Sequence, residues 1–392
     1  MVVMGWFMKF RLPWAGLCLL VLLHVLHVPL AAQSVPATPS APPPAPACTA
    51  QGPIDNWNAA AQLIAGVSNA AYAGSMTGEQ KAAWTDYSKT AAADWNRLKR
   101  RYVDRISAWR GKYLQKAPAT NAVFYPFSGP DATNPLAFFP DAGEYVLVGL
   151  EPAGCIPSKV EDFTPEYWPA LRQGWQTAAS MGFFKTENME RDLAEGPASG
   201  VLPVLLFLIA RAGNSVVDVT PLGITPTGAL IASDDKAATE TRGLTIQFKD
   251  PRQRLRTLRY FALNLQNRRL ARKPGTTKYL QTLPQGGTLV KSASYLMHKK
   301  YFSTIRGIIL DRSTVVIEDD SGIPYHYFFE PPVWDVRLFG AYDQPIDLFK
   351  TGLQEDLKAV YHAHRGIEPL DFSIGYKWRQ NESNLLLAVR KK

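Results

Sequence analysis

Apolar side chains recur at steps of three and four along one stretch of the chain, which is the spacing of a single helix face. The stripe consists of Trp84, Tyr87, Ala91, Trp95, Leu98, Tyr102, Ile106, Trp109 and Tyr113. Thr77 and Gln80 precede it at the spacing of a capping box, so the helix is expected to begin there. The pattern predicts a helical brace over residues 51–120 that packs on the main domain. Alternatively, the aromatic face binds a partner, as in a cell-envelope scaffold protein.

From residue 121 the pattern changes to short apolar runs that alternate with helical segments. Runs such as 145–150 are apolar on both faces, as strands of a sheet covered on both sides must be. Strands are predicted at 123–125, 145–150, 215–219, 244–249, 257–265, 288–295, 314–318, 325–328, 372–378 and 384–389, and helices at 166–180, 187–193, 202–211, 302–310 and 346–362. This alternation predicts an α/β fold over residues 121–392, with a mostly parallel Rossmann-like sheet and antiparallel hairpins.

The N-terminus has the features of an export signal. Two basic residues, Lys9 and Arg11, precede an apolar run from residue 12 to 30, and small residues at 31 and 32 allow cleavage after them. We therefore predict a signal peptide over residues 1–32 and a periplasmic or secreted protein. An uncleaved N-terminal membrane anchor is the alternative.

Residues 33–50 are rich in Pro, Ala and Ser and poor in apolar side chains, which predicts a linker without a core of its own. Export also changes the expectation for cysteine, because oxidising compartments favour disulfides. Cys18 lies in the predicted signal peptide, which leaves Cys48 and Cys155 as a pair. We predict a Cys48–Cys155 disulfide that fastens the mature N-terminus to the domain. Two unpaired thiols are the alternative.

The basic charge of the chain is concentrated in one segment. The formal charge is +9, and removal of Lys9 and Arg11 lowers it by two to +7. Residues 251–310 contain 13 Lys and Arg and no Asp or Glu. Such a surface favours anionic partners, including sugar phosphates, envelope polymers and the headgroups of a nearby membrane surface. Export argues against nucleic acid as the partner.

The stretch from residue 123 to 151 reads as a strand, a tight turn, a short helix and a second strand that ends in an acid. It resembles the first β-α-β unit of a Rossmann-like fold, in particular that of class I methyltransferases. In that family the turn cradles a nucleoside cofactor and the acid binds the ribose. The resemblance implies that Ser128, Gly129 and Asp131 lie in the loop and that Glu151 binds the sugar. The antiparallel hairpin predicted between the strands at 372–378 and 384–389 is also similar to the end of that fold.

The turn departs from the methyltransferase pattern because it has one Gly where G-x-G is usual and because Pro130 lacks a backbone donor. S-adenosylmethionine is also not expected outside the cytoplasm. We therefore expect the fold without that activity, and the cofactor stays open. A second resemblance, to a family of uncharacterised exported bacterial proteins, is carried by the segments YPFSGPD, VLVGLEPAG, LVKSASYLMH and EDDSGIPYHYFF. It supports one domain and implies no activity.

Three polar clusters follow predicted strands, and ligands of open α/β sheets bind beyond the strand ends. The clusters are Ser128, Asp131 and Glu151; then Lys291, Ser292, Ser294, Tyr295 and His298; then Asp319, Asp320 and Ser321. Together with Tyr125 and Gly129, these residues are expected to line one cleft. We predict that the cleft binds a small or polymeric anionic ligand, with catalysis left open. No metal site is predicted.

The same clusters allow a second hypothesis, a secreted hydrolase. Ser128 or Ser294 would be the nucleophile and His298 the base, and Asp319 or Asp320 would orient the base. No G-x-S-x-G elbow is present to expose a nucleophile. The competing interpretation is structural, with His298 hydrogen-bonded at a strand end and the two aspartates stabilising a turn.

Overall fold

The computed structural model describes residues 56–391, except residues 116, 180–195, 234, 330, 365, 378 and 380. The predicted signal peptide, the linker, Cys48 and the helix at 187–193 therefore lie outside the described residues. The Cys48–Cys155 disulfide stays a prediction for the same reason. Within the described part of the chain, every helix is too short or too polar to cross a bilayer.

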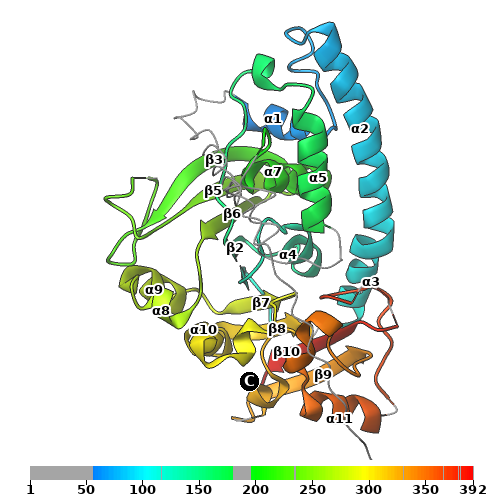
Figure 1. Ribbon diagram of the computed structural model, residues 1–392, viewed down its shortest axis with the longest axis vertical. Helices are drawn as coiled ribbons and strands as arrows, with labels where there is room; N and C mark the ends of the chain where they lie inside the picture. Colours follow the sequence, from blue (N-terminus) through cyan, green and yellow to red (C-terminus); the bar gives the residue numbers. More distant parts are fainter. Residues whose placement is uncertain are drawn as a thin grey trace, which may run out of the picture. The chain divides into compact units, whose positions relative to one another are not determined.

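One mixed sheet of ten strands forms the centre of the described fold (Figure 1). The strands are β1 (Ala122–Tyr125), β2 (Glu144–Gly149), β3 (Ser215–Ile224), β4 (Leu230–Ile231), β5 (Thr241–Lys249), β6 (Leu255–Ala262), β7 (Gly286–Val290), β8 (Ser313–Glu318), β9 (Trp334–Gly340) and β10 (Asn384–Arg390). Their order is β4-β3-β5-β6-β2-β1-β7-β8-β10-β9. The neighbouring pairs from β6 to β8 are parallel, and the other pairs are antiparallel. The predicted α/β fold with a mostly parallel core is confirmed.

The parallel strands have the order of a doubly wound sheet, because the chain fills one side of β1 with β2 and β6 and then moves to the other side for β7 and β8. The order reverses between β1 and β7. In open α/β sheets this switch point is where ligands bind, since the loops on either side of it diverge and leave a crevice. The topology therefore directs attention to the carboxyl ends of β1 and β7.

Helices cover both faces of the sheet, as its parallel core requires. The described helices are α1 (Trp57–Ile64), α2 (Gly78–Leu98), α3 (Asp104–Tyr113), α4 (Thr133–Phe138), α5 (Tyr167–Ala179), α7 (Leu202–Arg211), α8 (Asn267–Leu270), α9 (Pro274–Gln281), α10 (Ser303–Arg312) and α11 (Glu355–Ala363). The helices from α1 through α7 share one apolar core with one face of the sheet. Helices α8, α9 and α10 share a second core with the other face. Figure 1 shows these two helical layers.

The predicted brace helix is present as α2 and α3, joined by the π-helical turn η1 (Lys99–Val103). Both bonds of the predicted capping box form between Thr77 and Gln80. The aromatic stripe is buried against the domain, and Tyr102 of the π-turn donates a hydrogen bond to Asn134 beside the pocket described below. The stripe is therefore core, and it does not present the partner-binding face that the scaffold alternative requires.

Four predicted elements differ from the structure. The strand predicted at 288–295 ends at Val290, the segment 325–328 forms the 3-10 turn η5 (Tyr325–Phe328), and residues 372–377 form no strand. The partner of β10 in the closing antiparallel pair is instead β9. The predicted helix at 346–362 divides into the turn η6 (Asp347–Gly352) and α11.

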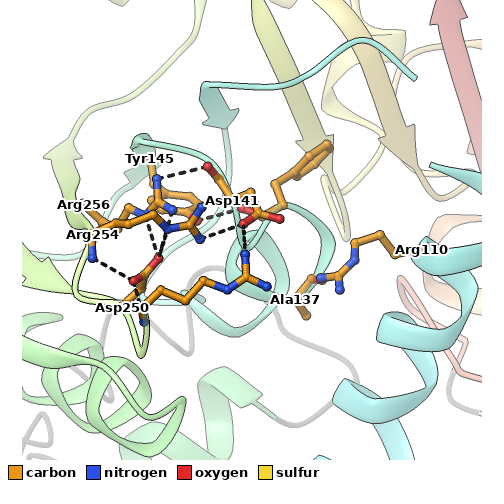
Figure 2. Close-up of polar contacts among 9 residues, drawn as sticks. Arg110, Ala137, Asp141, Tyr145, Asp250, Arg254 and Arg256 are labelled. Carbon is orange, nitrogen blue, oxygen red and sulfur yellow. Dashed lines mark hydrogen bonds and ion pairs between the residues drawn. The ribbon is translucent and has the colours of Figure 1, made fainter. Parts of the chain in front are cut away.

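The hairpin between β5 and β6 uses two arginines of the basic segment for structure (Figure 2). Asp250 accepts hydrogen bonds from the guanidinium groups of Arg254 and Arg256, and Arg254 also bonds Asp141. Burial raises the pKa of Asp250, but the bonds from Arg254 and Arg256 outweigh it and hold that pKa well below its usual range. This cluster lies at the amino ends of β2 and β6, which is the edge opposite the switch point.

Candidate functional site

A pocket of about 330 Å³ lies at the switch point, beyond the carboxyl ends of four neighbouring strands. The loops after β1, β2, β6 and β7 all line it. Its polar lining residues are Tyr125, Ser128, Asp131, Glu151, Asn264, Gln266, Lys291, Ser292 and Ser294, and its apolar wall includes Phe127, Leu150, Leu263, Leu265, Leu296 and Phe302. This volume and this mixture of apolar wall and few polar groups are typical of small-molecule sites.

A buried ion pair in the pocket lining joins the loop after β1 to the loop after β7. Lys291, which follows β7, places Nζ 3.4 Å from Oδ2 of Asp131, which follows β1, and the side chains are 7% and 5% exposed. Tyr125 and Asn134 donate to the same carboxylate at 3.0 Å and 2.6 Å. Burial and then the Asp131 carboxylate raise the pKa of Tyr125 well above its usual range, so this hydroxyl stays protonated as a donor.

Glu151 is the acid at the end of β2, and it is buried in the pocket wall. Tyr260 of β6 donates to its backbone carbonyl at 2.8 Å and lies 3.2 Å from its Oε2 atom. Gly149 makes this arrangement sterically feasible, because a Cβ atom there would lie 2.3 Å from Glu151 Oε2 and 2.8 Å from the Cα of Gly129. The close approach of the β1 and β2 loops therefore requires glycine at residue 149.

The pocket loops contain an unusual density of left-handed backbone. Phe127, Ser292, Ser294 and Tyr295 have φ between 52° and 59°, and only Gln253 shares this feature among the other described non-glycine residues. These conformations are costly for residues with a Cβ atom, and they concentrate at functional sites where the surrounding structure enforces them. Their gathering on both sides of the switch point supports a binding function for the pocket.

The strained loop after β7 is held from behind by the third polar cluster. The backbone N–H of Ser292 donates to Asp319 Oδ1 at 3.1 Å, and that of Ala293 donates to Ser321 Oγ at 2.8 Å. On the other side, Tyr376 donates to the Ser292 carbonyl at 2.7 Å and accepts from the Ser294 N–H at 3.0 Å. Asp319 therefore positions the loop and does not line the pocket.

The three consecutive acids at the end of β8, Glu318 to Asp320, are buried and energetically costly in their ionised form. Asp320 accepts hydrogen bonds from Tyr295 and from Asn384, whereas Asp319 Oδ2 has no partner within the described chain. Burial, followed by the neighbouring Asp320 carboxylate, raises the pKa of Asp319 to about 7. Burial also raises the pKa of Asp320 and, well above its usual range, that of Glu318.

The serine hydroxyls and His298 do not contact one another among the described residues. Ser128 donates to main-chain carbonyls, including that of Val148 at 3.2 Å, and Ser294 pairs with the Tyr376 hydroxyl at 2.7 Å. His298 packs edge-on against Tyr295, and its Nε2 atom is buried without a partner in the same part of the chain. Burial and then Lys299 lower the pKa of His298 to about 4. Neither serine hydroxyl forms the hydrogen bond to His298 that the hydrolase hypothesis requires among the described residues.

The first predicted cluster and three residues of the second thus share one pocket, and the third cluster lies behind its wall. The pocket collects Tyr125, Ser128, Gly129, Asp131, Glu151, Lys291, Ser292 and Ser294, whereas Tyr295, His298, Asp319 and Asp320 lie outside its lining. Sequence reasoning missed Asn134, Tyr376 and Asn384 as supports of these loops. For Asn134 the sequence contained a signal, because Asp131 precedes it by three residues, the spacing of a capping bond at a helix N-terminus. In the structure the Asn134 N–H donates to Asp131 Oδ1.

Two segments that adjoin the pocket lining carry exposed basic side chains. The pocket residue Gln266 directly precedes α8, and the pocket residue Phe302 is the last residue of the turn η4 (Lys300–Phe302). Asn267 ties these two segments together, with its Nδ2 atom 3.1 Å from the Lys300 carbonyl and 2.9 Å from Ser303 Oγ. The segments carry Arg268, Arg269 and Lys300, which are exposed and form no ion pair in the part of the chain that the structure describes.

Comparisons with protein-family models, with curated proteins and with solved structures found no match to this chain. The evidence for function is therefore the geometry of the pocket itself.

Proposed function

We propose that the switch-point pocket binds a small anionic molecule with a hydroxyl-bearing, sugar-like body, such as a nucleoside monophosphate or a sugar phosphate. The observation that carries the proposal is the convergence of four strand-end loops on one pocket that contains a buried Lys291–Asp131 pair and the buried acid Glu151. The body of the ligand would lie against the apolar wall, and its anionic group would lie at the mouth.

The acid at the end of β2 supports a hydroxyl-bearing ligand. Glu151 follows Gly129 by 22 residues. In doubly wound folds an acid about 20 residues beyond the glycine loop accepts hydrogen bonds from ribose hydroxyls. Glu151 lines the pocket from this position, so its carboxylate is the expected acceptor for a sugar.

The first loop argues against a diphosphate in its usual position. A dinucleotide places its pyrophosphate on N–H groups at the start of the first crossover helix. Here Pro130 lacks that donor and Asp131 places a carboxylate beside it. An anionic group would be repelled there, whereas Arg268, Arg269 and Lys300 in the adjoining segments would attract it.

Calorimetric titration of the full chain with adenosine 5′-monophosphate, ribose 5-phosphate, glucose 6-phosphate and adenosine tests the proposal. Phosphorylated sugars are expected to bind more tightly than adenosine. Glu151→Gln should weaken every sugar ligand by about tenfold or more, because it removes a charged hydrogen-bond acceptor. The pair Arg268→Ala and Arg269→Ala should weaken the phosphates alone.

Asp86→Asn is the matched control, since Asp86 is an exposed acid on α2, far from the pocket loops in sequence. This variant should leave every affinity unchanged. The proposal would be refuted if none of the four probes binds, or if the Glu151→Gln variant binds the sugar ligands with the same affinity as the wild type.

Methyl transfer from S-adenosylmethionine is the second candidate. It is favoured by the antiparallel β10 between β8 and β9, which is the closing arrangement that the resemblance to class I methyltransferases implies. Binding of S-adenosylmethionine to the full chain, lost in Glu151→Gln and unchanged in Arg268→Ala, would select this candidate over an anionic ligand.

The proposal includes export to the periplasm or the cell exterior. It is supported by Lys9, Arg11 and the apolar run that follows them. A fusion of residues 1–50 to alkaline phosphatase, which is active only outside the cytoplasm, should be active in a bacterial host. An inactive fusion would contradict export and would favour the methyltransferase.

A further inference from the structure

A second pocket, of about 450 Å³, lies between the turn η5 and α11, away from the switch point. Its lining consists of Tyr325, His326, Tyr327, Phe329, Asp356 and Val360. Four of these six side chains are aromatic, and they come from five consecutive residues. None of them lines the pocket discussed above, so this site is independent of the proposed function.

Two of the rings form an open corner. Tyr325 and Phe329 meet edge to face, with ring centroids 4.7 Å apart and planes at 70°. Phe329 is 44% exposed, which is unusual for a large apolar side chain in a protein that buries most of its aromatic residues. An exposed aromatic corner beside a hollow is a feature of ligand and partner sites.

One carboxylate accompanies the rings. Asp356, in the first turn of α11, is the only acid in the pocket lining, and its side chain is 44% exposed. Burial and then the Asp356 carboxylate raise the pKa of Tyr325, which indicates that the acid lies close to the ring. His326 Nδ1 is 3.9 Å from Asp356 Oδ2, beyond hydrogen-bonding distance.

The aromatic cluster already holds a cation within the protein. The guanidinium carbon of Arg306 lies 4.3 Å from the ring centroid of Tyr327. Arg306 also donates a hydrogen bond to the Met297 carbonyl, so it belongs to the folded core. It takes one face of Tyr327 and leaves Tyr325 and Phe329 as the rings available to a ligand.

We propose that this pocket binds an alkylammonium cation, such as a quaternary ammonium or methylated amine. Ring faces carry negative charge density and attract such cations, and their methyl groups also fill the apolar corner. Asp356 supplies the neutralising charge, while the open mouth leaves room for the remainder of the ligand outside. A neutral ligand of the same shape lacks both electrostatic contributions.

Titration of the full chain with choline, followed by calorimetry or ligand-observed NMR, tests this site. The matched probe is 3,3-dimethylbutan-1-ol, which has the shape of choline without its charge. Choline is expected to bind at least about fivefold more tightly than the alcohol, and Phe329→Leu and Asp356→Asn are each expected to weaken choline by about threefold or more. Absence of choline binding, or equal binding of the neutral alcohol, would overturn the proposal.

Controls separate this site from general effects. Leu255→Ala removes an exposed apolar side chain at the amino end of β6. Glu151→Gln alters the first pocket. Both variants should leave the affinity for choline unchanged. If either lowers choline affinity as strongly as Phe329→Leu, the assignment to this pocket is wrong. Sedimentation with phosphatidylcholine vesicles distinguishes a lipid headgroup from a free amine, because only the former brings the protein down with the vesicles.

Discussion

Lys291→Met removes the ammonium group of the buried pair while keeping an unbranched apolar side chain of similar length. Nζ of Lys291 and Oδ2 of Asp131 are 3.4 Å apart, and both side chains are nearly inaccessible to solvent. At this distance, with an effective dielectric constant of about 20, the Coulomb attraction is about 5 kcal/mol. The substitution leaves the Asp131 carboxylate buried without a cation, although Tyr125 and Asn134 still donate to it.

The expected loss of unfolding free energy is about 3 kcal/mol. Breaking a buried pair costs about 3–5 kcal/mol when the remaining charge is uncompensated, and the hydrogen bonds that Asp131 retains place the value at the lower end. Urea denaturation followed by tryptophan fluorescence measures it. Asp131→Asn should lower the unfolding free energy by less in the Lys291→Met background than in the wild type. The difference between the two losses, the coupling energy, should be about 1–3 kcal/mol.

Lys350→Met is the matched control, because Lys350 pairs with Asp347 at 3.2 Å but both side chains are more than 70% exposed. An exposed pair contributes at most about 1 kcal/mol, so the unfolding free energy of this variant should be close to that of the wild type. If Lys291→Met also stays within about 0.5 kcal/mol of the wild type, or if its effect and that of Asp131→Asn simply add, the pair does not join the two sides of the pocket.

Three further predictions concern the pocket and its support. The raised pKa of Asp319 means that ionisation destabilises the fold, so stability should fall as the pH rises from about 4 to about 7; Asp319→Asn should reduce this fall in urea titrations across that range. The lowered pKa of His298 acts with the opposite sign, since the unfolded chain binds the proton first below about 6.5, so His298→Gln should remove a rise in stability between about pH 4 and 6.5. An unchanged pH profile in either variant would show that the group does not titrate as its burial requires. Gly149→Ala should destabilise the protein and abolish ligand binding, because its Cβ would overlap Glu151 and the Gly129 backbone; wild-type affinity in that variant would refute the close approach.

Local sequence predicts the first half of the pocket well. The stretch from β1 to Glu151 is one β-α-β unit, and its strand ends, turn and terminal acid are all encoded within 30 residues. Parallel strands bring such ends to the same edge of the sheet, which is why Ser128, Asp131 and Glu151 were expected together. The structure places all three in one pocket.

The other half of the pocket, formed by the loop after β7, could not be predicted, because distant segments impose its geometry. Ser292, Ser294 and Tyr295 have no intrinsic preference for a left-handed backbone, so the segment was expected to continue as a strand. The turn is enforced by two hydrogen bonds of Ser292, whose N–H donates to Asp319 and whose carbonyl accepts from Tyr376; these partners lie 27 and 84 residues away. The β9–β10 pairing was missed for a related reason, since the strand-like segment 372–378 lies nearer in sequence than β9 does.

Hydrogen–deuterium exchange of the full chain, with and without adenosine 5′-monophosphate, tests the central claim most directly. The account predicts that the ligand slows exchange in two segments, 127–131 and 292–296, which flank the switch point, and leaves the β5–β6 hairpin and α2 unchanged. Slower exchange at that hairpin instead, or an unchanged pattern at ligand concentrations that saturate calorimetric binding, would contradict the claim that these loops form the binding site.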